Sequence, residues 1–301
     1  MKPRVVITGG SGLLGLNWAS CIRDDFEAIL GLNERSASLP GTTSFRFDWS
    51  NRSEWSKQLE AMSPALVVHT AGLTNVELCE ADPKKAQALN TDLAAQVAEY
   101  CGKKKAGLIH ISTDHLFDGS APLVREEHPL CPLNVYGRTK AEGETAVLQA
   151  CPEALVVRTN FYGWGPPYRR SFSDWIIDSL RAGREIGVFE DVFYTPILAA
   201  KLVSSAMELW SKGVHGVIHL AGPERISKHE FAVRVASEFD LDHRLIRRAQ
   251  LANSPQLVQR PFDMSLSSDK AWAMLSSHPG TLDEHIKMLA REQESGLTST
   301  L

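Results

Sequence analysis

Apolar and polar positions follow two different rhythms along the first half of the chain. Short runs of β-branched and other apolar residues are separated by longer stretches in which apolar positions recur every three or four residues. The first rhythm is typical of buried strands and the second of amphipathic helices. We predict strands at Val5–Thr8, Ala28–Leu32, Ser44–Phe47, Ala65–Thr70, Gly107–Ser112 and Leu155–Arg158. We predict helices between them at Leu13–Asp24, Ser53–Met62, Pro83–Tyr100 and Asn134–Gln149.

Strands that alternate with helices predict an α/β fold. Each helix carries the chain back to the start of the next strand, so the strands pair in parallel and helices cover both faces of the sheet. We therefore expect a Rossmann-type, doubly wound parallel sheet with a smaller C-terminal substrate-binding domain.

The alternation loosens after Arg158. The stretch Gly163-Trp164-Gly165-Pro166-Pro167 is a loop by composition, because Gly and Pro interrupt regular structure. Later helices are predicted at Phe172–Ala182 and Ala199–Lys212, with short strands at Ile186–Phe189, Phe193–Thr195 and Val217–Leu220. We assign residues 1–162 to the sheet domain, with residues 193–221 returning to it. Residues 163–192 and 222–301 form the smaller lid domain.

Composition excludes several classes of protein. Of 301 residues, 43% are hydrophobic and 23% are charged, and the net charge of −4 gives no reason to expect nucleic acid or an anionic membrane as a partner. No apolar run approaches the roughly 18 residues of a membrane span, and no signal peptide is visible. The five cysteines are scattered without a C-x-x-C pair. We expect free thiols in the cytoplasm and no metal site.

A glycine-rich turn follows the first predicted strand directly. Glycines stand at positions 9, 12 and 15 and open the first predicted helix. Such a turn lets the backbone approach a pyrophosphate, which the free N–H groups at the helix start then hold. The strand–turn–helix context favours an NAD(P)-binding domain over a plain tight turn. The candidate cofactor residues here are Gly9, Ser11, Gly12, Leu13, Leu14 and Gly15.

The end of the second strand bears on the type of cofactor. An acidic residue there suits the ribose of NAD, whereas an arginine suits the phosphate of NADP. Asn33-Glu34-Arg35 supplies both signals, and Arg35 favours NADP. Asp48, with Trp49 beside it, follows the third strand and is placed to accept a hydrogen bond from the adenine amino group. A position near a helix start is the alternative role for Asp48.

Two further segments indicate the reaction class. One is Ser112-Thr113-Asp114 at the end of a strand, and the other is a Y-x-x-x-K pattern formed by Tyr136 and Lys140. Their spacing puts the phenol and the ammonium on one helical face, so the ammonium can lower the phenol pKa from about 10. Thr113 can then bind a substrate carbonyl while Tyr136 protonates the alkoxide that forms on hydride transfer. A surface helix pair is the alternative for this pattern alone.

At these residues the sequence resembles the extended short-chain dehydrogenase/reductases, specifically the dTDP-4-dehydrorhamnose reductase family of sugar-nucleotide reductases. The blocks that carry the resemblance run across nearly the whole chain: Thr8–Gly15, His69–Gly72, Ser112–Gly119, Pro132–Lys140, Arg158–Phe161 and Arg260-Pro261. The blocks Ser112–Gly119 and Pro132–Lys140 are much more specific than the glycine turn.

The resemblance implies an oxidoreductase that uses NADP or NAD and acts on a nucleotide-linked sugar, as in the synthesis of dTDP-rhamnose. It implies that Thr113, Tyr136 and Lys140 are catalytic and that Asn90 supports a proton relay. It further places Ala71, Gly72, Leu73, Tyr136 and Lys140 against the cofactor, and Thr113, Asp114, His115, Phe161 and Arg260 against the substrate.

The chain departs from the family pattern on the substrate side. His115 stands where the family commonly carries a tyrosine, and the loop with Arg169 and Arg170 differs from the usual segment. The stretch Asp191–Pro196 also differs. These differences leave open which sugar and which nucleotide are bound, and whether the substrate is another carbonyl compound.

A second class of function stays open. The regulatory subunit of mammalian methionine adenosyltransferase resembles the same family and serves as a binding partner. A non-catalytic NADP-binding module is therefore the alternative to a reductase. The oligomeric state also stays open, with a homodimer among the choices.

Overall fold

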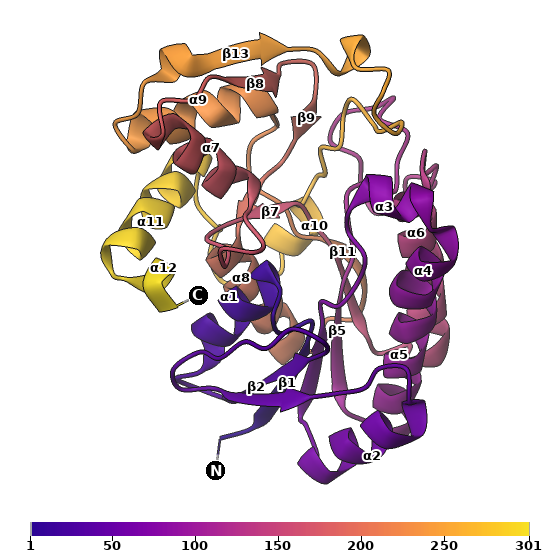
Figure 1. The fold of residues 1–301 in the computed structure, drawn as a ribbon. Helices are drawn as coiled ribbons and strands as arrows, with labels where there is room; N and C mark the ends of the chain where they lie inside the picture. Colours follow the sequence, from indigo (N-terminus) through magenta and orange to yellow (C-terminus); the bar gives the residue numbers. More distant parts are fainter. Residues whose placement is uncertain (1, 301) are drawn as a thin grey trace.

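A seven-stranded parallel sheet forms the centre of the larger part of the molecule (Figure 1). The computed structural model describes residues 2–300. The strand order is β11-β6-β5-β4-β1-β2-β3, so the chain winds outward in both directions from β1. The strands are β1 Arg4–Thr8, β2 Glu27–Leu32, β3 Thr43–Arg46, β4 Leu66–His69, β5 Gly107–Ile111, β6 Leu155–Arg158 and β11 Gly216–His219.

Helices cover both faces of this sheet because successive strand side chains point to opposite faces. Val5 and Ile7 of β1 pack with the helices of one face, whereas Val6 packs with those of the other. The first face is covered by α1 Leu13–Ile22, α8 Ala199–Ser211 and α10 Asp269–Trp272. The second is covered by α2 Arg52–Met62, α5 Leu93–Lys104 and α6 Val135–Ala150.

The smaller part has its own apolar core, formed mainly by residues after position 161 (top of Figure 1). Three two-stranded sheets lie there: β10 with β7, β12 with β9 and β13 with β8. Their strands are β7 Phe161–Tyr162, β8 Ile186–Phe189, β9 Phe193–Tyr194, β10 Ile197–Leu198, β12 Ile226–Ser227 and β13 Ile246–Ala249. The helices are α7 Phe172–Arg181, α9 Lys228–Glu238, α11 Leu282–Glu294 and α12 Leu297–Thr300, with 3-10 turns at His243–Leu245 and Leu251–Asn253.

The sequence-based elements of the sheet lie where they were predicted, to within two residues at each end. The long helix expected over Pro83–Tyr100 is different. It is divided into α4 Pro83–Gln87, a π-helical turn Ala88–Asp92 and α5, and it is preceded by α3 Val76–Ala81. The π-turn contains Asn90, whose side chain turns away from the helix to bind the backbone of Leu73.

The division into two domains stays a prediction at its boundaries. Strand β11 lies beside β6, so the chain returns to the main sheet before residue 221. Strand β9, however, pairs with β12 of the smaller part. Ala271 of α10 is buried in the core of the main sheet, so the last third of the chain contributes to both cores.

Candidate active site

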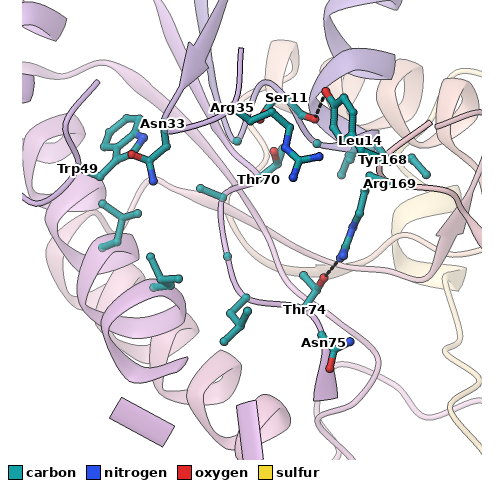
Figure 2. Close-up of a pocket in the computed structure, with 18 of the residues that line it drawn as sticks. Ser11, Leu14, Asn33, Arg35, Trp49, Thr70, Thr74, Asn75, Tyr168 and Arg169 are labelled. Carbon is teal, nitrogen blue, oxygen red and sulfur yellow. Dashed lines mark hydrogen bonds between the residues drawn. The ribbon is translucent and has the colours of Figure 1, made fainter. Parts of the chain in front are cut away.

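A cavity of about 450 Å³ lies at the carboxyl ends of β1, β2 and β4. In open parallel sheets this edge, where the strand order reverses, is the usual place for a ligand. Figure 2 shows the labelled side chains around the cavity. Its lining includes Gly9, Ser11, Gly12, Leu13, Leu14, Asn33, Arg35, Trp49, Thr70, Ala71, Gly72, Leu73, Thr74, Asn75, Phe161, Tyr168 and Arg169.

The glycine turn has a backbone that other residues could not adopt without displacement. Gly9 has a φ of +68°, and a Cβ there would lie 2.9 Å from the backbone nitrogen of Ala71. Gly15 lies outside the cavity lining, and a Cβ at Gly15 would lie 2.9 Å from the Cα of Gly10. Gly15 therefore allows α1 to approach the turn, while Gly9 and Gly12 leave a cradle open to a phosphate group.

The cofactor residues predicted from the sequence divide into those that line the cavity and those that do not. Gly15, Asp48, Tyr136 and Lys140 are outside the lining. Ten of them line the cavity: Gly9, Ser11, Gly12, Leu13, Leu14, Arg35, Trp49, Ala71, Gly72 and Leu73. Asp48 is exposed and accepts hydrogen bonds from the backbone and hydroxyl of Ser50, which lower the pKa of its carboxyl. The residue that caps helix α2 is Asn51. Asp48 thus lies outside the cavity lining, whereas its neighbour Trp49 is part of the lining.

Arg46 is a cation near the cavity that the sequence analysis did not single out. It donates one hydrogen bond to the carbonyl of Glu34, at 3.1 Å, and another to the hydroxyl of Ser36, at 2.9 Å. Its place opposite Leu32 in the β2–β3 pairing brings a second guanidinium to the segment that carries Arg35. The predicted strands Ala28–Leu32 and Ser44–Phe47, paired in parallel, could have placed Arg46 beside the end of the second strand.

Thr113, Tyr136 and Lys140 are brought together at the end of β5 and the start of α6. All three are buried. The Thr113 hydroxyl donates to the Asp114 carboxylate at 3.1 Å, and the Lys140 ammonium donates to the carbonyl of Ile111 at 2.7 Å. Asn134 caps α6 by accepting from the backbone of Gly137 at 2.9 Å, which fixes where the helix begins.

Burial controls the ionisation of these groups. Burial raises the pKa of the Tyr136 phenol well above its usual range, and the hydrogen bond to Thr113 only partly opposes it. Burial lowers the pKa of Lys140 to about 8, with the Glu144 carboxylate acting in the opposite direction. The expectation that Lys140 lowers the phenol pKa is therefore not met here, because desolvation of the phenolate is the larger effect.

Asn90 links the cavity to α6. Its side-chain oxygen accepts from the backbone of Leu73 at 2.8 Å, and its amide nitrogen donates to the Leu73 carbonyl and to the Thr139 hydroxyl, both at 3.0 Å. Leu73 lines the cavity and also packs against the apolar cluster that contains Tyr136. The catalytic candidates and the cavity are thus joined through one asparagine and one loop.

The predicted substrate residues are placed less uniformly. Asp114 is buried and accepts hydrogen bonds from Thr113 and Asn160. The His115 ring lies 5.4 Å from the Tyr136 ring in an edge-to-face arrangement, and burial lowers the pKa of His115. Phe161 lines the cavity described above, on the cofactor side.

Arg260, the predicted anion-binding residue, is paired within the chain. Its guanidinium donates to the carboxylate of Glu77 and to the carbonyl of Val258. Glu77 belongs to α3, the helix that the sequence analysis did not predict. An anion at this place would compete with Glu77 for the guanidinium.

The described residues offer neither a metal centre nor a membrane-spanning helix. Within residues 2–300, no three His, Cys, Asp or Glu side chains gather where they could hold a metal ion. No helix in the same range combines the length and apolar character that crossing a membrane requires.

Comparison with known proteins places these features in context. The sequence model of one family, described as the RmlD substrate binding domain, matches residues 2–294. The chain is 30% identical over 281 residues to a dTDP-4-dehydrorhamnose reductase of Sinorhizobium fredii, covering 89% of this chain and 90% of that protein. It is 29% identical over 278 residues to methionine adenosyltransferase 2 subunit beta of Pongo abelii, covering 89% and 81%.

A solved structure shows the same fold. It is a dTDP-4-dehydrorhamnose reductase of Bacillus anthracis in complex with NADP, with a TM-score of 0.85 and 24% sequence identity. The match covers 97% of this chain and 100% of that one. The strand order, the glycine turn and the smaller part therefore belong to one known architecture.

Proposed function

Because the chain belongs to the RmlD substrate binding domain family, we propose that it is an NAD(P)H-dependent reductase of a keto group on a nucleotide-linked sugar. The observation that carries the proposal is that Leu73, which lines the cavity of about 450 Å³, also packs against the apolar cluster that contains the buried Tyr136. Thr113 and Lys140 are buried as well. The specific reaction we propose is reduction of the 4-keto group of dTDP-4-dehydrorhamnose. The reductase of Sinorhizobium fredii, whose name carries that substrate, supports this choice.

The chemistry of the chain is that of a general acid. A reduced nicotinamide cofactor, held by the glycine turn at Gly9 and Gly12 and by Ala71, would supply a hydride to the carbonyl carbon when bound. Tyr136 then donates its phenolic proton to the carbonyl oxygen, so a C–H bond and an O–H bond form and the ketone becomes an alcohol. Thr113, whose hydroxyl donates to Asp114 in the free protein, would turn that hydroxyl to donate to the same carbonyl oxygen and hold the carbonyl beside the phenol.

Lys140 and Asn90 support that transfer. Below pH 8 the Lys140 side chain is an ammonium, and we propose that it binds the nicotinamide ribose and stabilises the phenolate left after proton transfer. Asn90 makes two hydrogen bonds to the backbone of Leu73 and one to the Thr139 hydroxyl, so it ties the Leu73 loop to α6. It is a positioning residue for the cavity wall, and we propose that it supports a proton relay to Tyr136.

We propose that NADP is preferred over NAD. Arg35 lines the cavity, and Arg46 lies on the neighbouring strand with its guanidinium on Glu34 and Ser36. Guanidinium groups bind phosphate by paired, charge-assisted hydrogen bonds. A phosphate on the adenosine ribose would be attracted by both guanidinium groups. The two uncharged ribose hydroxyls of NAD would gain no comparable charge–charge attraction.

A regulatory, non-catalytic role is the second candidate. The 29% identity to methionine adenosyltransferase 2 subunit beta favours it. The buried Thr113, Tyr136 and Lys140 favour catalysis, because a subunit that only binds a partner has no need of a desolvated phenol beside a desolvated ammonium.

Oxidation of NADPH in the presence of dTDP-4-dehydrorhamnose, followed by absorbance, tests the proposal. We expect rapid turnover, and faster turnover with NADPH than with NADH. A Tyr136→Phe preparation is the control for slow background oxidation. Tight NADPH binding without turnover of any keto-sugar nucleotide would contradict the reductase proposal and favour the regulatory role.

Assembly and location are proposed on narrower grounds. A homodimer stays among the possible assemblies, and sedimentation at several concentrations would test it. We propose a cytoplasmic location, because all five cysteines are free and three of them are buried as thiols. Fractionation of cells that express the protein would test the location.

A further inference from the structure

A short loop crosses the mouth of the cavity from the smaller part of the molecule. Residues 166–170 of this loop, which lies between β7 and α7, are called the strap. Its Tyr168 and Arg169 line the cavity together with residues of the glycine turn and of the β4 loop (Figure 2). The cofactor cavity is therefore built by both parts of the chain.

Tyr168 makes two contacts with the cofactor-binding side. Its hydroxyl donates to the carbonyl of Ser11 in the glycine turn at 3.0 Å. The Cζ of Arg35 lies 4.1 Å from the centre of the Tyr168 ring. Figure 2 shows the phenol reaching Ser11 while the Arg35 side chain lies beside it. The Tyr168 ring is thus held through its hydroxyl group, and the Arg35 guanidinium stacks on its face.

The rest of the strap is anchored independently. Arg169 donates from its guanidinium to the hydroxyl of Thr74 on the opposite side of the cavity. Arg170 donates to the carbonyl of Gly165 at 3.1 Å and pairs with Asp178 of α7 at 3.2 Å. A loop fixed at three places can hold a side chain in one orientation.

We propose that Tyr168 is the positioning residue for Arg35, so that the strap sets the preference of the cavity for NADP over NAD. This inference rests on the proposed function only in that the cavity binds a nicotinamide dinucleotide. An arginine stacked on an aromatic ring keeps the N–H groups at its edge free for a phosphate. Stacking also removes the rotamer freedom that an exposed arginine would otherwise lose on binding.

The test measures cofactor binding without any sugar substrate. Dissociation constants for NADPH and NADH are determined by titration calorimetry for the wild type, Tyr168→Leu, Tyr168→Phe, Arg35→Ala and the double variant Arg35→Ala/Tyr168→Leu. We expect Tyr168→Leu to weaken NADPH binding by about two- to fivefold more than NADH binding, the worth of a cation–π contact near a surface. Tyr168→Phe keeps the ring and should keep most of the NADPH preference.

The double variant separates stacking from unrelated damage. If Tyr168 acts through Arg35, the Tyr168→Leu change should have no further effect on NADPH preference once Arg35 is alanine. Trp175→Leu is the matched control, since Trp175 is 39% exposed against 44% for Tyr168 and lies on α7 outside the cavity lining. It should leave both dissociation constants unchanged.

Two outcomes would overturn the inference. Equal weakening of NADPH and NADH in Tyr168→Leu would show that the ring acts only as a wall of the cavity. Additive effects in the double variant would show that Tyr168 and Arg35 act separately. Failure of the reductase proposal has a different signature, which is an intact NADPH preference without turnover of a keto-sugar nucleotide.

Discussion

At the scale of single residues, burial decides what each group of the site can do. The phenol of Tyr136 is kept neutral because its surroundings disfavour the phenolate. A neutral phenol is the form that donates a proton, which suits reduction of a ketone. The Lys140 ammonium, with a pKa near 8, is also marginally held in its charged form. At neutral pH the phenol of Tyr136 is therefore protonated and uncharged, and the amine of Lys140 is protonated and positively charged.

Removal of the Tyr136 hydroxyl should separate chemistry from binding. We expect Tyr136→Phe to lower kcat by about 10²- to 10⁴-fold, the usual contribution of a positioned general acid. NADPH binding, measured by fluorescence titration, should change little because the ring remains. Near-normal turnover in this variant would rule out Tyr136 as the proton donor.

The Lys140 ammonium should limit activity at alkaline pH. Its pKa near 8 lies below the usual value of 10.5, so the charged form is present below pH 8 and is lost as the pH rises through 8. We expect kcat to fall in that range. Lys140→Arg, which stays charged, should retain less activity but lose the fall near pH 8. An unchanged pH profile in that variant would assign the fall to another group.

At the scale of elements, the strands of the main sheet were predictable from the sequence. The short strands β7, β10, β12 and β13 and the helices α3, α9 and α11 were not predicted. Buried runs such as Val5–Thr8 identify strands because both faces of a parallel sheet are covered. Ser227 and Thr281 cap the starts of helices α9 and α11, and each is followed three residues later by a glutamate. This spacing is a capping signal that could have revealed both helices. The contact of Tyr168 with Ser11 joins residues far apart in the chain, and no local pattern encodes such a contact.

The start of α6 is held close to the loop before it. A Cβ on Gly137 would overlap the carbonyl oxygen of His115 and lie 2.8 Å from the Cβ of Pro132. We expect Gly137→Ala to lower the free energy of unfolding by about 1–3 kcal/mol, the usual cost of overpacking. It should also lower kcat, because Tyr136 is the preceding residue on the same helix.

Urea unfolding of Gly137→Ala and of Glu142→Ala provides the comparison. Glu142 is exposed on the same helix, so its replacement should change stability by no more than about 0.5 kcal/mol. Equal stability of the two variants would mean that the loop moves aside without cost.

At the scale of the whole molecule, buried histidines should make the fold sensitive to acid. Burial lowers the pKa of His69 to about 3 and that of His219 to about 3, and it also lowers the pKa of His110. An unfolded histidine titrates near 6.5. The unfolded chain therefore binds more protons between pH 6.5 and 3, and the free energy of unfolding falls as the pH drops through that range.

Replacement of one buried histidine should flatten this dependence. The Nδ1 of His219 donates to the carbonyl of Val124, and its Nε2 accepts from the guanidinium of Arg158. We expect His219→Gln to reduce the slope of unfolding free energy against pH by up to about 1.4 kcal/mol per pH unit between pH 3 and 6.5. Chemical denaturation at several pH values measures the slope, and an unchanged slope would mean that His219 is not among the groups responsible.

The sheet is completed out of chain order, which matters while the protein is being made. Strand β6 ends at Arg158, but its outer neighbour β11 begins only at Gly216. At about 5–20 residues per second, a ribosome takes roughly 3 to 12 seconds to synthesise the segment between them. During that interval the apolar edge of β6 lacks its partner, and an open edge strand can pair with another nascent chain. The order of the strands thus makes the synthesis of residues 159–215 a period of exposure to aggregation and to chaperones.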